Sequence, residues 1–209
     1  MLSLQTVLPH TLELIKRLMA QPLFSDMRLV GGTALALQYA HRRSIDIDMF
    51  GVLEPDTSKV TEALKEFGMI KQGGCSQKVK TYELDGVKVD FVDYSAYPWL
   101  DEPVVSDGIR LASPRDIAAM KINAIQGRGS RKDFVDMYFL LQYYSLSEII
   151  SFYAAKYPEH SEYRAMLSLT YFEDAETQPM PYMLQSVTWP EMKSFILQSV
   201  EDYNNQRSR

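Results

Sequence analysis

The sequence predicts an α+β fold in which a mixed half of strands and helices is followed by a helical half. Three observations lead to this prediction. Strand and helix patterns interleave up to about residue 104, an Asp-Gly pair separates two alternating apolar runs, and helical periodicity dominates after Pro103. We therefore expect an α/β core over residues 1–104 and a helical region over residues 105–209, with the two parts sharing one cleft.

The N-terminal elements follow from periodicity and punctuation. Pro9 suits the first turn of a helix whose apolar residues recur at helical spacing up to Leu18. A short apolar run then predicts a buried strand, which Gly31-Gly32 ends in a tight turn before a helix. The next run alternates strictly and predicts a strand with its apolar residues on one face. These segments are Met27–Val30, Thr33–Tyr39 and Ile45–Phe50, with Ile45, Ile47 and Met49 on the apolar face.

The remaining elements complete the predicted fold. Asp56 or Thr57 can cap a helix that stops at Gly68. The pair Asp85-Gly86 predicts a tight hairpin between two strands. The strands are Val79–Leu84 and Val87–Tyr94, and the later helices are expected over 113–127, 131–144, 146–156, 161–172 and 189–204.

Composition limits the class of protein. The chain is 46% apolar and 23% charged, as in ordinary soluble globular proteins, and its formal net charge is -5, which disfavours general binding of polyanions. A single cysteine, Cys75, excludes an internal disulfide and fits a reducing cytoplasm. Charges within Met1–Ala20 exclude a signal peptide or a membrane span there. The three histidines, His10, His41 and His160, lack the spacing of a zinc site.

A pair of acids after the glycine turn is the central chemical feature. Asp46 and Asp48 are two residues apart on a predicted strand, so their side chains share one face. Neighbouring carboxylates repel each other unless a cation neutralises them, and Mg²⁺ prefers carboxylate and phosphate oxygens. The Gly31-Gly32 turn leaves backbone N–H groups available for phosphate at a helix start. The alternative is that both acids lie on a solvated strand face.

A third carboxylate is expected from the hairpin. Asp90 takes the face opposite Val87, Val89 and Phe91, so three acids meet if this strand lies beside Ile45–Phe50. Three carboxylates can hold two metal ions in phosphoryl-type transfer. Asp93 is the competing candidate, although it falls in register with the apolar face or beyond the strand end.

Charged residues in the helical half supply further candidates. Lys121 lies on or beside an apolar stripe, and it is interpreted either as a phosphate ligand or as a lysine whose stem is buried and whose ammonium reaches solvent. Asp133 and Asp136 share one helix face, where Asp133 can equally serve the helix start. Between Arg110 and Lys132 the bases outnumber the acids, which predicts a local patch for RNA or triphosphate unless it is only a solvated surface. The bases are Arg110, Arg115, Lys121, Arg128, Arg131 and Lys132, against Asp116 alone.

Taken together, these segments resemble the AbiEii/AbiGii nucleotidyltransferase toxin family. The resemblance spans about residues 28–145 and implies a polymerase-β-like nucleotidyltransferase core, a mixed sheet with flanking helices, followed by a helical part. Where the usual signature begins Gly-Ser, this chain has Gly32-Thr33, which keeps a hydroxyl group. The matching segments are Gly31–Leu37, His41–Asp48, Lys121 with Arg128, and Arg131–Asp136.

The residue patterns and the resemblance together lead to expected roles for the candidate residues. Asp46 and Asp48 are expected to hold Mg²⁺ or Mn²⁺, with Asp90 as a third ligand or as the base that activates the acceptor. Lys121 is expected to contact phosphate, and Asp133 to act as a base or to orient Lys121. The nucleoside triphosphate is assigned to Gly31, Gly32, Thr33, Arg43 and Ser44 together with Lys121.

The expected reaction moves a nucleoside monophosphate from a nucleoside triphosphate to an acceptor hydroxyl. RNA, above all tRNA, is the expected acceptor, and the family implies a cytoplasmic toxin of a toxin–antitoxin or abortive-infection pair with a cognate antitoxin and no membrane partner. Two alternatives stay open. One is a small-molecule nucleotidyltransferase of the aminoglycoside-modifying type. The other is a non-catalytic nucleotide-binding protein of the same fold, which the presence of both Asp46 and Asp48 disfavours.

Overall fold

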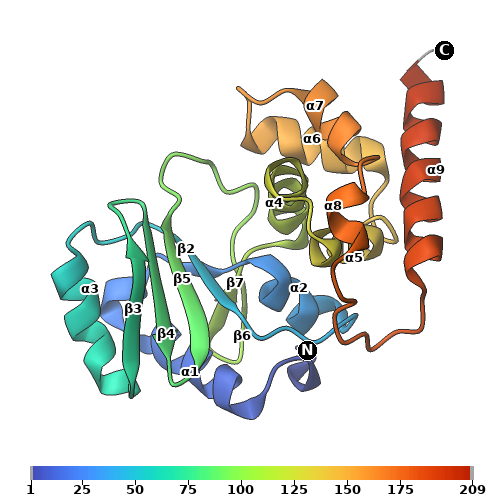
Figure 1. Ribbon diagram of the computed structural model, residues 1–209. Coiled ribbons are helices and arrows are strands. Elements are labelled where there is room, and N and C mark those ends of the chain that lie inside the picture. The colour runs from blue at the N-terminus through green and yellow to red at the C-terminus, as the bar shows by residue number, and fades with distance from the viewer. Residues whose placement is uncertain (1, 208–209) are drawn as a thin grey trace. The chain divides into compact units, whose positions relative to one another are not determined.

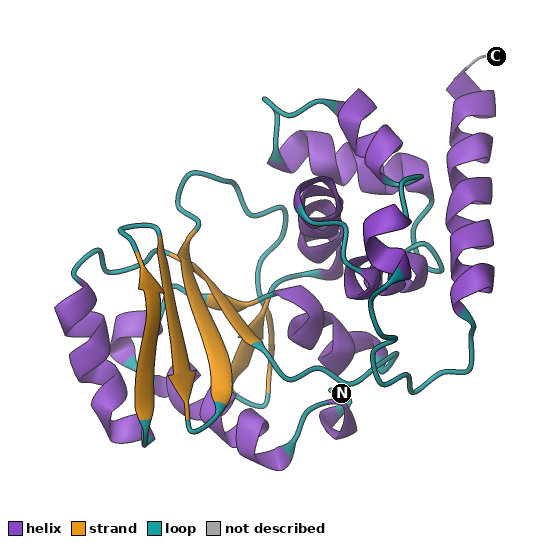
Figure 2. Cartoon of the chain, in the orientation of Figure 1, coloured by secondary structure: helices purple, strands orange, loops and turns teal. Residues whose placement is uncertain are grey.

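The computed structural model describes residues 2–207, which form two compact units. Unit 1 comprises the chain up to Pro98 together with Glu102–Ala112. Unit 2 comprises Trp99–Asp101 and the chain from Ser113 onwards. Among the described residues, the strands belong to unit 1 and unit 2 is built from helices and loops (Figure 2). The predicted α+β class is confirmed.

Unit 1 is built on one mixed sheet of seven strands in the order β3-β4-β5-β2-β1-β7-β6 (Figure 1). β2 runs parallel to β5 and antiparallel to β1, and β4 and β5 form the predicted hairpin. Asp85 and Gly86 both have positive φ, at 47° and 81°, as a tight hairpin turn requires. The strands are β1 (Arg28–Leu29), β2 (Ile47–Gly51), β3 (Ile70–Cys75), β4 (Val79–Leu84), β5 (Val87–Asp93), β6 (Val104–Ser106) and β7 (Ile109–Leu111).

Helices cover one face of the strands β3, β4 and β5. Tyr82, whose side chain is buried, meets the hydroxyl of Thr61 from α3 at 2.9 Å, and Phe91 stacks on Phe24 at a centroid distance of 4.6 Å. These contacts fix the apolar face of the sheet and leave the alternate side chains on the other face. The helical segments of unit 1 are η1 (Leu4–Thr6), α1 (Pro9–Ala20), η2 (Pro22–Phe24), α2 (Gly31–Tyr39), α3 (Thr57–Leu64) and η3 (Lys65–Phe67).

Unit 2 packs its helices around a core that contains a fully buried ion pair. The ammonium of Lys156 lies 2.6 Å from the Asp116 carboxylate, and neither side chain is exposed. Asp116 also accepts hydrogen bonds from the backbone of Leu100 and from Ser113, so both of its oxygens are satisfied. The helices are α4 (Pro114–Gly127), α5 (Arg131–Leu140), α6 (Leu146–Lys156), α7 (Glu162–Ser168), α8 (Glu173–Glu176) and α9 (Trp189–Arg207). None of the described helices is long and apolar enough to span a lipid bilayer.

Several predicted elements are corrected. β3, β6 and β7 were not predicted, and β6 and β7 extend the sheet past residue 104. β2 begins at Ile47 rather than Ile45, and Ile45 is exposed instead of lying on the apolar face. Gly31-Gly32 is not a turn that precedes a helix; both residues belong to the first turn of α2. The reason is that the backbone of Val30 pairs with the carbonyl of Asp48, which carries the chain directly into the helix.

Candidate active site

Asp48 and Asp90 face each other across neighbouring strands. β2 and β5 are parallel, and the register pairs Asp48 with Asp90 and Ile47 with Val89. Side chains paired in this way project to the same face of the sheet, while Ile47 and Val89 are buried on the other face. The condition for bringing Asp90 near the first two acids, that the two strands lie side by side, is therefore met. Asp93 pairs instead with Gly51 at the end of the strand, and its carboxylate accepts a hydrogen bond from the Ser95 hydroxyl.

The Asp48 carboxylate also lies against the start of helix α2. A Cβ atom added to Gly31 would collide with Oδ2 of Asp48, so only a residue without a side chain allows this approach. Gly31 has a φ of +67°, which is the second reason for glycine here. The first N–H groups of a helix have no carbonyl partner within the helix, and the helix start carries partial positive charge. Asp48 thus stands beside a place suited to anions.

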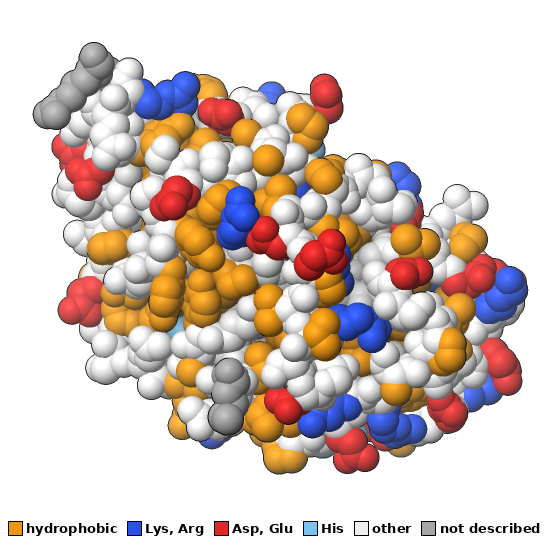
Figure 3. Space-filling view, turned by 180° about the vertical axis from the view of Figure 1, so that it is seen from behind, with side chains coloured by type: hydrophobic (Ala, Val, Ile, Leu, Met, Phe, Trp, Pro, Cys, Tyr) orange, Lys and Arg blue, Asp and Glu red, His pale blue; other side chains and the backbone are white. Residues whose placement is uncertain are grey.

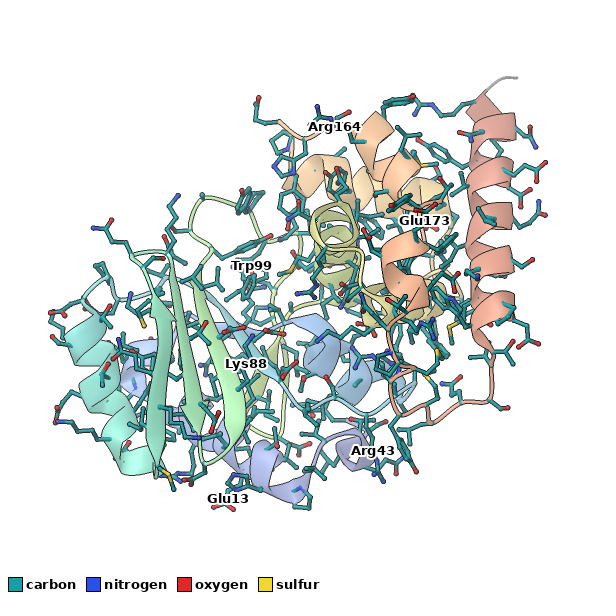
Figure 4. The ribbon with its side chains drawn as sticks, in the orientation of Figure 1. Glu13, Arg43, Lys88, Trp99, Arg164 and Glu173 are labelled. Carbon is teal, nitrogen blue, oxygen red and sulfur yellow. The ribbon has the colours of Figure 1, made fainter. Side chains whose placement is uncertain are left out.

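Lys88 is the cation of this site. Its ammonium donates to Oδ2 of Asp90, and Thr81 donates to Oδ1 of Asp90 at 2.7 Å. The hydrogen bond to Asp90 raises the pKa of Lys88, and the charges of Asp90, Asp48 and Asp46 raise it further. Figure 4 labels Lys88 on β5. The three predicted carboxylates therefore share one electrostatic environment with a lysine.

Asp46 lies just before β2, and a hydrogen bond to its backbone carbonyl fixes its position. The hydroxyl of Thr33, which is 1% exposed, donates to the carbonyl of Asp46 and lies 2.9 Å from the Ser44 hydroxyl. The side chains of Thr33 and Ser44 therefore fasten the loop that carries Asp46 to helix α2. Contacts of Thr33 and Ser44 with a triphosphate stay a prediction. Because the Thr33 hydroxyl is engaged, the contact predicted for Thr33 rests on its backbone N–H.

Two arginines follow helix α2 and differ in their surroundings. Arg42 is 3% exposed, and a Cβ added to Gly32 would meet its guanidinium, so this group packs directly against the first turn of α2. Arg43, assigned to nucleotide binding from the sequence, is exposed, and Figure 4 shows it apart from Lys88. Arg42 was not predicted as a site residue. Arg42 and Arg43 are adjacent, and the sequence does not show which of the two guanidinium groups is buried.

The candidates in unit 2 form their own buried cluster. Lys121 on α4 lies 3.0 Å from Asp133 and 2.6 Å from Asp136 on α5, with Lys121 only 5% exposed and both acids fully buried. Arg128 adds a two-pronged contact to Asp133 at 2.8 and 2.9 Å. Burial alone would raise the pKa of Asp133, but Lys121 and Arg128 outweigh it and the pKa is strongly lowered. The structure excludes a Lys121 ammonium that reaches solvent.

The predicted basic strip is not an open basic patch. Arg110 belongs to unit 1 and donates to the backbone carbonyls of Met19, Phe24 and Met27. In unit 2, Arg115 pairs with Asp101 at 2.8 Å, and Arg131 donates to the carbonyl of Ala175 while covering the ring of Trp189. Lys121 and Arg128 contact the acidic cluster, while the side chains of Arg115 and Arg128 stay 46% and 60% exposed. On the face that Figure 3 shows, basic and acidic side chains are interspersed.

The donor chemistry around Asp46 and Asp48 fits a hard divalent cation. Carboxylate oxygens are the ligands that Mg²⁺ prefers, and it usually binds through one or two of them together with phosphate oxygens. Across residues 2–207, no three acidic, histidine or cysteine side chains are arranged as a ready metal site. Asp90, engaged by Thr81 and Lys88, therefore stays a predicted rather than an observed third ligand.

Replacing Gly31 by alanine is expected to displace the Asp48 carboxylate. The change adds a Cβ where that carboxylate lies and puts a side chain at a left-handed φ, which costs about 1–2 kcal/mol. We expect the free energy of unfolding to fall by about that amount and activity to fall at least about tenfold. Gly108→Ala is the matched control, because Gly108 has a φ of +79° with open space around its Cβ. Equal activities in the two variants would show that the Gly31–Asp48 approach is not needed.

Comparison with known proteins assigns the chain to a family. The family described as "Nucleotidyl transferase AbiEii toxin, Type IV TA system" matches residues 13–207. An uncharacterised protein of Aquifex aeolicus is 32% identical over 201 residues, which cover 91% of this chain and 94% of that protein.

Solved structures of low sequence identity share the fold. MenT4, a nucleotidyltransferase toxin from Mycobacterium tuberculosis, matches with a TM-score of 0.60 at 14% identity, over 95% of this chain and 83% of that one. A protein from H. pylori assigned as a nucleotidyltransferase matches with a TM-score of 0.51 at 17% identity, over 94% of both chains. The chain therefore belongs to the AbiEii nucleotidyltransferase toxin family and is a nucleotidyltransferase.

Proposed function

We propose that the protein transfers a nucleoside monophosphate from a nucleoside triphosphate to an acceptor hydroxyl, and that the transfer needs Mg²⁺ or Mn²⁺. The observation that supports this most is the position of Asp48. Its carboxylate lies opposite Asp90 on one side and against the start of α2 on the other. Carboxylates attract divalent cations and helix starts attract phosphate, and a metal–triphosphate complex offers both groups.

The proposed reaction is a displacement at the α-phosphorus. The acceptor oxygen forms a bond to the α-phosphorus, the bond from that phosphorus to the bridging oxygen breaks, and pyrophosphate leaves with the electron pair. Asp90, whose carboxylate is oriented by Thr81 and Lys88, is the proposed base for the hydroxyl proton. The metal ion, held by Asp46 and Asp48, would neutralise charge on the phosphate oxygens. The N–H groups of Gly31, Gly32 and Thr33 would orient the triphosphate.

The acceptor that we propose is an RNA hydroxyl, with tRNA as the first molecule to test. The contacts of the bases between Arg110 and Lys132 weaken the charge argument that favoured RNA from the sequence. Arg115 and Arg128 nevertheless keep 46% and 60% of their side chains exposed, which supports contact with a phosphate backbone. The same contacts weaken the argument against a small acceptor. An aminoglycoside-type acceptor is therefore the second candidate, since the formal net charge of -5 favours a cationic partner.

A transfer assay decides between these acceptors. The protein is incubated with each α-labelled nucleoside triphosphate, Mg²⁺, and either total RNA, purified tRNA or a panel of aminoglycosides. We expect label in RNA with at least one triphosphate, release of one pyrophosphate for each nucleotide added, and no product in excess chelator. Labelled aminoglycoside without labelled RNA would select the second candidate. The absence of product with every triphosphate and acceptor would refute the proposed transfer.

A growth assay addresses the toxin role. The type IV toxin–antitoxin family implies an antitoxin partner. Expression of the wild-type protein without a partner is expected to slow bacterial growth, and the Asp48→Asn variant at equal abundance is expected not to. Equal growth inhibition by the two proteins would separate toxicity from nucleotidyl transfer.

A further inference from the structure

A hollow of about 290 Å³ lies on the sheet beside Asp90. Lys71 and Gly73 line it from β3, Thr81 and Glu83 from β4, and Lys88 from β5. Thr81 and Lys88 are also the two residues that hold the Asp90 carboxylate. Asp90 does not itself line the hollow, but its two hydrogen-bond donors do, so the hollow adjoins the proposed base and lies within unit 1.

The open face of the sheet exposes this hollow. Thr81 and Glu83 alternate with the buried Tyr82 and Leu84 on β4, so their side chains lie on the face that α3 does not cover. In Figure 1 the strands β3, β4 and β5 face the viewer, and no helix of unit 1 passes in front of them. An acceptor can reach Asp90 from this side without displacing any element of unit 1.

Gly73 keeps the hollow open. A Cβ added at this position would come within 3.2 Å of the Thr81 side chain, so any larger residue narrows the space between β3 and β4. The next residue, Gly74, has nothing within 4 Å of an added Cβ. A side chain at position 73 would therefore crowd the hollow, whereas one at position 74 would meet open space.

The lining groups suit a ligand whose hydroxyls both donate and accept hydrogen bonds. Lys71 pairs with Glu83 at 2.6 Å, and Lys88 pairs with Asp90, so two cations and two anions balance at the hollow. Ammonium groups only donate hydrogen bonds and carboxylates only accept them, whereas a sugar hydroxyl does both. The volume lies at the small end of ligand pockets, which span about 300–1,000 Å³, and suits one ring more than a large ligand.

We propose that this hollow is the acceptor site and that it binds a sugar ring with neighbouring hydroxyls, one of which reaches Asp90. The inference rests on the proposed function, because Asp90 must serve a transfer for the hollow to matter. The terminal ribose of an RNA strand and the ring of a free aminosugar share this chemistry. The transferred group is the same in both cases, and the hydroxyl proton passes to Asp90 as pyrophosphate leaves.

Matched variants test the site through the acceptor KM. Lys71→Met removes a hydrogen-bond donor that lines the hollow and pairs with Glu83. Lys65→Met is the control, because it removes an exposed lysine that also pairs with a glutamate, Glu62 on α3. Lys71→Met is expected to raise the acceptor KM at least about tenfold, the effect of a hydrogen bond to a charged group. Its affinity for nucleoside triphosphate, measured by direct titration, is expected to stay within about twofold. Lys65→Met is expected to change neither quantity.

Two valine variants and a comparison of acceptors complete the test. Gly73→Val is expected to raise the acceptor KM as Lys71→Met does, and Gly74→Val to leave it unchanged. RNA with an intact terminal ribose is compared with the same RNA after periodate oxidation, and with a free aminosugar. Loss of transfer on oxidation identifies the ribose, and transfer to the aminosugar alone identifies the small acceptor.

The failures are distinguishable. An active wild-type protein whose acceptor KM is unchanged by both Lys71→Met and Gly73→Val would overturn the acceptor site and leave the proposed function standing. A wild-type protein that transfers nothing to any acceptor would overturn both.

Discussion

The Asp48→Asn variant is expected to lose more than about 100-fold of its transfer activity while keeping its fold. Even groups that only support a metal ligand cost about 10–100-fold when changed, and Asp48 is proposed as a ligand itself. Asparagine has nearly the same shape but no charge. Because it also removes the repulsion between Asp48 and Asp90, the melting temperature without ligand is expected to stay the same or to rise.

The same substitution on β5 separates the two candidates for the third carboxylate. Asp90→Asn is expected to act as Asp48→Asn does, because the two residues are paired in register. Asp93→Asn is the matched control at the end of the same strand, where the side chain bonds to Ser95. Transfer rates and Mn²⁺ binding with a non-hydrolysable triphosphate measure all three variants. Full activity in Asp48→Asn, or a loss confined to Asp93→Asn, would contradict the proposed site.

Replacing Lys121 by methionine is expected to lower the free energy of unfolding by about 3–5 kcal/mol at pH 7. The change leaves Asp133 and Asp136 buried without the ammonium that lies within 3.0 Å of both. Lys193→Met is the matched control. It removes a partly exposed lysine paired with Glu176 in the same unit, and its cost is expected to stay below about 1 kcal/mol. Chemical unfolding followed by fluorescence measures both variants.

The stabilisation by the Lys121–Asp133 pair is expected to depend on pH. The pKa of Asp133 is lowered in the folded protein, so its contribution to stability is present above the unfolded pKa of about 3.9 and is lost as the pH falls below it. In Lys121→Met, Arg128 still favours the ionised form of Asp133, but the part of the gain that Lys121 supplies is lost. The difference in unfolding free energy between wild type and variant is therefore expected to shrink as the pH falls from about 5 through the lowered pKa of Asp133. A difference independent of pH would show that Lys121 stabilises the fold through packing alone.

The part of the site that depends on local pattern could be predicted from the sequence. Alternation in β2 and β5 placed Asp48 and Asp90 on the polar face, and the Asp85-Gly86 turn fixed the hairpin register. Gly31 and Gly32, which precede Asp46 and Asp48 in the sequence, indicated that a helix begins near these acids. Each of these predictions uses neighbours within a few residues along the chain, where periodicity determines which side chains share a face.

Partners distant in sequence could not be predicted. β3 escaped prediction because its residues Gln72–Cys75 are exposed and include two glycines, so no apolar alternation marks them. The bases between Arg110 and Lys132 suggested an RNA surface, but a charge count does not reveal that Arg110 binds carbonyls more than eighty residues away. Lys88 was not predicted as a site residue, because only Asp90 lies near it on the same strand and the other two acids, Asp46 and Asp48, come from another part of the chain.

The chain crosses between its two units three times, which determines how proteolysis or truncation would affect it. Trp99–Asp101 belong to unit 2, where Asp116 accepts the backbone N–H of Leu100, while Glu102–Ala112 return to unit 1 as β6 and β7. The polypeptide therefore passes between the units at residues 98–99, 101–102 and 112–113. A single protease cut at one of these crossings gives two fragments, at least one of which carries residues of both units, so the fragments stay together as long as each unit stays folded. A gene fragment that ends at any one crossing strips at least one unit of residues that it needs.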